Sequence, residues 1–257
     1  MVKPSLLVIP FAFLVLATLL APLIAPYDPM HTDPARQLEA PSRNHLLGTD
    51  LLGRDVLSRA LYGGQHTLLI AGMATLIAVI PGVLLGLLGA VNWVDRLVTI
   101  FVNAVLTFPG LLLALLILTL IGQGAVPLAM ATGFTQLAPC ARITRSAVIS
   151  VMSLGYVESA YSLGARQAWV IVKHVLPNVL FTVLAYTAVI FAYAILNSAA
   201  LSFLGLGGEP GIPDWGVMLA EGRQAFRAAP WIAAVPGFVI TLTVVLANRI
   251  TSAVSKL

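Results

Sequence analysis

The chain has 257 residues, of which 59% are hydrophobic and only 9% charged, and its mean hydropathy is +0.97. Soluble domains average about 25% charged residues, so the composition excludes an ordinary water-soluble domain. The net charge of +4 does not indicate nucleic-acid binding, because the basic residues form no run, and the single cysteine, Cys140, excludes an internal disulfide.

The chain opens with Lys3 and an apolar run over residues 5–25, which has two interpretations. A secretory signal would begin in this way, but the run is long for the apolar core of a signal. The segment from Pro22 to Pro26 also makes a poor cleavage site. We therefore expect a retained transmembrane helix over 1–26, followed by an extracytoplasmic loop over 27–66.

A short amphipathic helix is predicted inside the 27–66 loop. Asp55 and Arg59 stand four residues apart and could form an ion pair, and Asp50 could cap the start of the helix. Such a helix either lies solvated at the interface or offers a contact to a partner protein. Three apolar residues share one of its faces: Leu52, Val56 and Ala60.

Five further apolar runs follow, and a span needs about 20 residues. They lie at 67–91, 97–121, 126–141, 179–206 and 231–247. The run at 126–141 is the weakest, because it is short and contains Thr132, Gln136 and Pro139. Counting it, we expect an all-α integral membrane protein with about six transmembrane helices. Gly82 and Gly86 predict a close helix crossing.

Six spans place both termini and a long loop over 142–178 on one side of the membrane. The 27–66 and 207–230 loops then lie on the other. Lys and Arg are more numerous on the first side, which favours the cytoplasm for it. That side holds Lys3, Arg96, Arg142, Arg145, Arg166, Lys173, Arg249 and Lys256, and the other holds Arg36, Arg43, Arg54, Arg59, Arg223 and Arg227.

The 142–178 loop has the periodicity of two short amphipathic helices. Gly164 can adopt positive φ between them, and Pro177 is expected to end the second. Such a hairpin either lies on the lipid headgroups or places its apolar face in a groove of a partner. The first face consists of Tyr156, Ala160 and Leu163, and the second of Ala168, Ile171, Val172 and Val175.

The residue string of this loop resembles the coupling-loop signature of ABC importer permeases. Glu158-Ser159-Ala160 is followed at the family's spacing by Gly164 and then by Leu176-Pro177, with Ser159 in place of an alanine and His174 in place of an isoleucine. The strings at 45–59 and 201–219 are similar to those of the dipeptide/oligopeptide/nickel group. The second of these is typical of the second permease of a pair.

The resemblance implies a type I importer permease fold in the bacterial inner membrane, with a permease core over 67–257. A cytoplasmic coupling-helix hairpin would join the fourth and fifth spans and contact the ATPases. The implied coupling residues are Glu158, Ser159, Ala160, Leu163, Gly164, Ala165, Leu176 and Pro177. Glu158 would anchor the first short helix, Ala160 and Leu163 would provide the packing face, and Leu176-Pro177 would return the chain to the fifth span.

The implied partners are a homologous second permease, one or two ABC ATPase subunits and an extracytoplasmic solute-binding protein. The partner to the 45–59 segment would be the solute-binding protein or the sister permease. We expect no cofactor on this chain, with ATP and Mg²⁺ on the ATPases. Candidates for the translocation path are the polar residues within spans, which could equally form interhelical hydrogen bonds: Asn103, Thr107, Gln136, Asn197 and Ser198.

Several alternatives are weighed against this interpretation. A secondary transporter is disfavoured because no ionisable side chain lies within a span. An intramembrane enzyme would need a polar catalytic cluster at one membrane face, and the sequence contains none, whereas a membrane scaffold remains an alternative. The Walker A, His-Glu-x-x-His and Gly-x-Ser-x-Gly strings are absent. His31 and His45 share a loop with Asp33 and Asp50, so a metal site is conceivable, although solvated side chains explain them equally simply. The solute could be a peptide, nickel, or a glycosidic or opine-like molecule.

Overall fold

The structure, a computed structural model, describes residues 4–90, 92–207 and 211–254. Throughout these residues the secondary structure is helical, apart from one isolated bridge between Thr49 and Asp55. Lys3 and Lys256, which entered the charge comparison, lie outside the described residues, as does part of the predicted 207–230 loop.

Three of the described helices are long and apolar enough to cross a membrane. They are α3 (Val56–Leu87), α9 (Leu176–Phe203) and α11 (Trp231–Val254). α6 (Ala125–Met152) is a further 28-residue helix of more polar composition, and α1 (Pro4–Leu19) is shorter, with 16 residues. Four short elements complete this part of the fold: α2 (Ala21–Ile24), η1 (Pro34–Arg36), η2 (Leu88–Ala90) and α10 (Trp215–Gln224).

The apolar run at 97–121, predicted as one span, is broken in the structure. The segment forms two helices, α4 (Asn92–Leu106) and α5 (Gly110–Ile121), which are bent by 90°. Pro109 stands at the break with an extended ψ of 125°. Proline has no N–H to donate and disfavours helical geometry in the residue before it, so α4 ends before it and α5 starts after it.

The centre of the fold is the crossing of α3 with α6, where glycines let the two backbones approach. A Cβ on Gly82 would lie 2.8 Å from the Cβ of Cys140, and one on Gly133 would lie 2.7 Å from the carbonyl oxygen of Ala74. A Cβ on Gly86 would overlap Thr144. The close crossing predicted from Gly82 and Gly86 is therefore confirmed.

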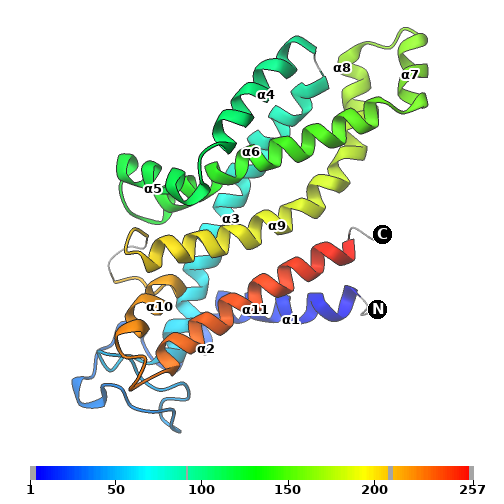
Figure 1. Ribbon diagram of the computed structural model, residues 1–257. Coiled ribbons are helices and arrows are strands. Elements are labelled where there is room, and N and C mark those ends of the chain that lie inside the picture. Colours follow the sequence, from blue (N-terminus) through cyan, green and yellow to red (C-terminus); the bar gives the residue numbers. More distant parts are fainter. Residues whose placement is uncertain (1–3, 91, 208–210, 255–257) are drawn as a thin grey trace.

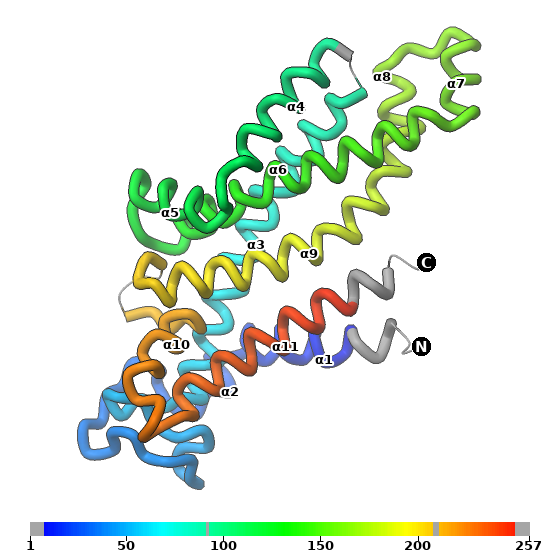
Figure 2. Tube along the Cα trace, viewed as in Figure 1, coloured from blue at the N-terminus to red at the C-terminus, as the bar shows by residue number. Residues whose placement is uncertain are grey.

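Figures 1 and 2 show how the helices are arranged around this crossing. α1 and α11 lie together at one edge, α4 and α5 lie at the opposite edge, and α3, α6 and α9 lie between them. A helical hairpin containing α7 (Gly155–Ser162) and α8 (Gln167–Val170) projects at one end, the hairpin end. The α10 end carries α10 and the 26–55 segment. α1 begins and α11 ends on the side of the hairpin.

Candidate functional site

The hairpin is built from the end of α6, then α7, a tight turn, α8, and a π-helical turn, η3 (Ile171–Val175), which leads into α9. α6 continues without interruption to Met152. The loop therefore begins later than predicted, and Arg142 and Arg145 belong to α6. No sequence signal marks this boundary, because the helical periodicity simply continues through the two arginines.

Gly164 makes the turn between α7 and α8. Its φ is +82°, a left-handed conformation that glycine adopts at low cost. The N–H of Gly164 donates to the carbonyl of Tyr161 at 2.9 Å, and the N–H of Ala165 donates to that of Ala160 at 3.0 Å. These two bonds form a Schellman motif, which satisfies the last carbonyls of α7.

The second arm of the hairpin does not end at Pro177. An apolar helical segment runs from Gln167 to Phe203, with Pro177 in the first turn of α9. The N–H of Leu176 bonds to the carbonyl of Ile171, five residues back, and so forms the π-helical turn. Asn178 Nδ2 donates to the carbonyl of His174 at 2.7 Å. The π-helical turn and this side-chain bond let the helix continue past the missing N–H of the proline.

The hairpin is attached to the permease body by a valine cluster, whose members are all fully buried. Ala160 and Ala165 pack against this cluster and are partly buried. From the predicted second face, Val175 is buried but Ala168 and Val172 are exposed, because α8 buries Val170 instead and the π-helical turn then places Val175 on the same side as Val170. The cluster consists of Val148, Val157, Val170, Val175 and Val179.

The opposite face of the hairpin leaves large apolar side chains uncovered. Leu163 is 89% exposed, Trp169 50% and Tyr156 45%. The ring of His174 lies between two of these, 5.0 Å from the Trp169 ring and 5.7 Å from the Tyr156 ring, measured between centroids. The amide of Asn178 also donates to the hydroxyl of Tyr156 at 3.2 Å. The aromatic groups of α7 and α8 are thus held in fixed positions at the start of α9.

Six of the eight predicted coupling residues lie in this hairpin, and the other two, Leu176 and Pro177, begin α9. The side chain of Glu158 is exposed, and its backbone carbonyl accepts a bond from Ser162 Oγ at 3.1 Å. Ser159 Oγ donates to the carbonyl of Gly155 at 2.8 Å. Leu176 is half-buried and Pro177 is exposed. α7 is positioned mainly by Val157 and Ala160. The face predicted from periodicity included Ala160 but not Val157.

The predicted path residues fall into two groups. Asn103 on α4 and Thr107 just after its end are exposed, whereas Ser198 is fully buried and donates to the carbonyl of Ile195 at 3.1 Å. Gln136 on α6 and Asn197 on α9 are half-buried. The structure therefore brings Asn103 and Thr107 onto one exposed face and turns Ser198 into the packed interior.

A second polar site, which the sequence did not predict, lies at the α10 end. In this ion network Arg54 Nε bonds to Asp50 at 2.7 Å, and Arg54 Nη2 bonds to both carboxylate oxygens of Glu221 at 3.1 Å. Arg59 Nη1 contacts Asp50 and also lies 2.6 Å from Glu221. The ion network (Asp50, Arg54, Arg59 and Glu221) joins the 26–55 segment to α10.

Two predictions about this segment are wrong. Asp55, not Asp50, caps α3, accepting a bond from the N–H of Ser58 at 2.8 Å. Asp55 does not pair with the side chain of Arg59, because Arg59 is held in the ion network. Burial alone raises the pKa of Asp50. This effect is outweighed by the positive charge of Arg59, by hydrogen bonds from the backbone N–H groups of Arg54 and Leu52, and by the charge of Arg54. The pKa of Asp50 is therefore lowered from its ordinary value.

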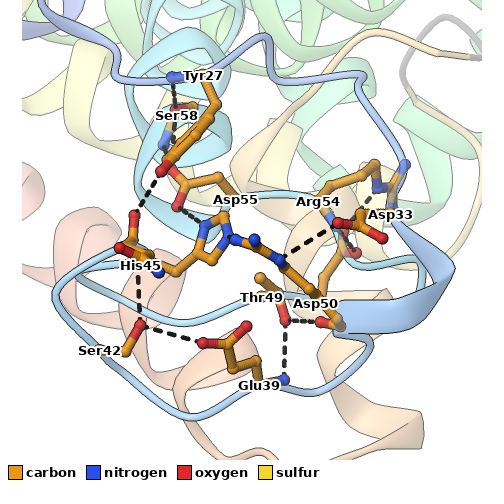
Figure 3. A network of polar contacts seen from close by, with 12 residues as sticks. Tyr27, Asp33, Glu39, Ser42, His45, Thr49, Asp50, Arg54, Asp55 and Ser58 are labelled. Atoms are coloured by element: carbon orange, nitrogen blue, oxygen red, sulfur yellow. Dashed lines mark hydrogen bonds and ion pairs between the residues drawn. The ribbon is translucent and has the colours of Figure 1, made fainter.

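His45 lies beside the ion network in the 26–55 segment, as Figure 3 shows. Its Nδ1 is 2.9 Å from Asp55, its Nε2 is 3.2 Å from Arg36, and its ring lies 4.8 Å from that of Tyr27. Both ring nitrogens thus have protein partners. Within the part of the chain that the structure describes, no three His, Cys, Asp or Glu side chains gather where they could hold a metal ion.

The sequence matches a known family of membrane transport proteins. The model of the family described as "Binding-protein-dependent transport system inner membrane component" matches residues 67–257. The chain belongs to this family. The recognition of the sequence as an ABC importer permease is therefore confirmed, and this family member is a multi-pass protein of the inner membrane.

The sequences of known relatives match more of this chain than the family model, which begins at residue 67. The di/tripeptide transport system permease protein DppC of Pseudomonas aeruginosa is 37% identical over 243 residues, covering 91% of this chain and 80% of that protein. The dipeptide permease DppC of Alkalihalophilus pseudofirmus is 35% identical, covering 92% and 78%. The glutathione permease GsiD of Pectobacterium atrosepticum is also 35% identical, covering 89% and 77%.

A solved structure supports the fold of this transport component independently. It is described as an amino acid ABC transporter with histidines, and it matches with a TM-score of 0.59 at 20% identity. The match covers 78% of this chain and 92% of that chain. At this identity the likeness concerns the fold alone, and it confirms the all-α permease fold expected from the sequence.

Proposed function

We propose that this permease subunit moves a peptide through the membrane and is driven by partner ATPases that act on the α7–α8 hairpin. The observation that carries the proposal is the division of the hairpin into two faces. The valine cluster attaches one face to the permease body, and the other face exposes Leu163, Trp169 and Tyr156. Exposed apolar side chains on a small, firmly attached unit are typical of a surface that docks into a partner's groove.

The connection to α9 gives the hairpin a mechanical role. Because α8, the π-helical turn and α9 form a 37-residue helical segment, the hairpin has no flexible joint on that side. Such a segment is about 55 Å long. Displacement of the hairpin by closing ATPases would therefore tilt α9 and switch access to the path. The alternative, that the hairpin lies on headgroups, gives no role to this rigid connection.

The remaining assembly follows from the family resemblance. We assign the hairpin and both termini to the cytoplasm, ATP and Mg²⁺ to one or two ATPase subunits, and the second half of the path to a homologous permease. A solute-binding protein would deliver the solute at the α10 end. The relatives are named for dipeptides, di- and tripeptides and glutathione, which favours a peptide as the solute. Nickel remains the alternative within the group.

The test is co-purification of the complex with hairpin variants. Gly164→Leu forces a bulky side chain into a left-handed conformation, and Glu158→Lys reverses an exposed charge on α7. Both should leave membrane insertion intact and weaken ATPase association. Gly205→Leu is the matched control, because Gly205 has a φ of +81° in an equally open position at the other end of α9.

Two outcomes would contradict the proposal. Complexes carrying Gly164→Leu and Glu158→Lys could hold together and transport normally, which would remove the hairpin from coupling. Alternatively, uptake by the unaltered complex could survive complete ATP depletion, which would indicate a secondary transporter.

A further inference from the structure

Two arginines that are three residues apart on α6 are compensated in different ways. Arg145 forms a two-armed ion pair with Asp95, with distances of 2.5 Å and 2.6 Å. Arg142 instead donates to an amide, from its Nη2 to Asn103 Oδ1 at 2.9 Å. Among the described residues, the structure gives Arg142 no carboxylate partner. Because an amide oxygen has no net charge, the positive charge of Arg142 stays uncompensated.

The contact of Arg142 lies near the end of α4. Asn103 is eight residues beyond Asp95, which corresponds to about 12 Å along the helix. It stands close to the break at Pro109 that bends α4 against α5. The partner of Arg145 lies near the start of α4, whereas that of Arg142 lies in its last turn. Arg142 itself is exposed, so its guanidinium group is accessible to a solute.

The surroundings of Arg142 are polar on an otherwise apolar surface. Asn103 on α4 and Thr107 just after its end are exposed one turn apart, close in the sequence to exposed Ile100 and Phe108. A cavity of about 80 Å³ lies between α4 and α6, lined by Arg142, Asn103 and Thr99 among others. The hydroxyl of Thr99 is buried without a hydrogen-bond partner. Lipid tails do not solvate such groups, so this face suits a water-filled path.

We infer that Arg142, held by Asn103, binds the carboxylate of the transported solute in the half of the path nearer the hairpin. A guanidinium group offers five N–H donors in a planar fork that matches a carboxylate, and Arg142 uses one of them on Asn103. Every unblocked peptide carries a C-terminal carboxylate, whereas a nickel ion would be repelled. The inference rests on the proposed function, since it takes the solute to be a peptide.

The experiment uses the full complex, with its ATPases and binding protein, in proteoliposomes and dialanine as the solute. Arg142→Gln should lower ATP-driven uptake by about tenfold or more, because it removes a charge-assisted bond. Arg96→Gln is the matched control, since Arg96 is exposed near the start of α4, and it should leave uptake unchanged.

A second variant tests the charge itself. Cys140 is the only cysteine of this chain, so Arg142→Cys in a Cys140→Ser background gives the permease a single thiol, and the Cys140→Ser complex without it shows the reaction of the other subunits. Reaction with aminoethyl methanethiosulfonate attaches a cation and should restore much of the uptake. Reaction with sulfonatoethyl methanethiosulfonate attaches an anion and should not. Dialanine should slow both reactions, because it would occupy the same position.

The outcomes separate this inference from the proposed function. A wild-type complex that takes up no dialanine contradicts the peptide assignment, and the inference falls with it. Normal uptake by Arg142→Gln, or restoration by both reagents, overturns the inference alone. Reaction rates that are the same with and without dialanine show that the solute does not occupy this position. An uptake defect that disappears without anionic lipid assigns it to a lipid phosphate. Either result overturns the inference.

Discussion

The two ends of the molecule are held together by different forces. At the α10 end, the ion network fixes the 26–55 segment against α10 through buried charges. At the hairpin end, the valine cluster fixes α7 and α8 through apolar packing. Ion pairs require particular partners at particular distances, whereas apolar contacts are non-directional.

This difference fits the roles proposed for the two ends. Losing one partner of a buried ion network leaves a charge without compensation, so such a network defines one arrangement strictly. Because apolar contacts are non-directional, the valine cluster allows the hairpin to move together with α9 and to retain its contacts. The α10 end is thus suited to a fixed structure and the hairpin end to a transmitted displacement.

The largest expected effect is at the ion network. Arg59→Gln leaves Asp50 and Glu221 partly uncompensated in a buried setting, and we expect it to lower the free energy of unfolding by about 3–5 kcal/mol. Chemical unfolding in detergent measures this change. Arg227→Gln, an exposed arginine at the same end, is the control and should change it by about 0–0.5 kcal/mol. Equal effects of the two variants would show that the network does not hold this end.

An intermediate effect is expected at the valine cluster. Val157→Ala removes a fully buried side chain's outer methyl groups and should cost about 1–3 kcal/mol. Because Val157 lies at the base of the hairpin, amide hydrogen exchange should become faster in α7 and α8 while α3 stays protected. Val172→Ala, on an exposed side chain, is the control. Unchanged exchange in α7 would contradict the role of the cluster as the attachment of the hairpin.

The smallest expected effect concerns the pH dependence of stability. It arises from protonation of Asp50, which takes place only in acid and so leaves stability at neutral pH unchanged. Its pKa in the folded protein is below the ordinary value of 3.8, so its contribution to stability is complete above that value and is lost as the pH falls through the folded pKa. The melting temperature of the wild type should therefore fall more steeply below pH 4 than that of Asp50→Asn. Parallel curves for the two proteins would remove Asp50 from the acid response. The hairpin variants should leave this acid response unchanged.

The local sequence was sufficient to locate the hairpin along the chain, but it did not predict which face of the hairpin is buried. The sequence spacing of three landmarks is diagnostic of the hairpin: Glu158, Gly164 and Leu176-Pro177. The turn between α7 and α8 needs a residue with left-handed geometry, and Gly164 provides it. The buried face was not predictable in the same way. The π-helical turn after Val170 displaces the register by one residue, and neither Pro177 nor periodicity announces it.

The sequence by itself determined that this protein is membrane-embedded and helical, because long apolar runs with few charges have no other stable solution in lipid. It also determined the family, because spacing-matched strings persist along the chain. Only the tertiary structure decided which distant charges meet. The partners of Arg54 and Arg142 come from other helices, Glu221 on α10 and Asn103 on α4. Such pairings depend on how helices pack, and local patterns carry no record of packing partners far away in the chain.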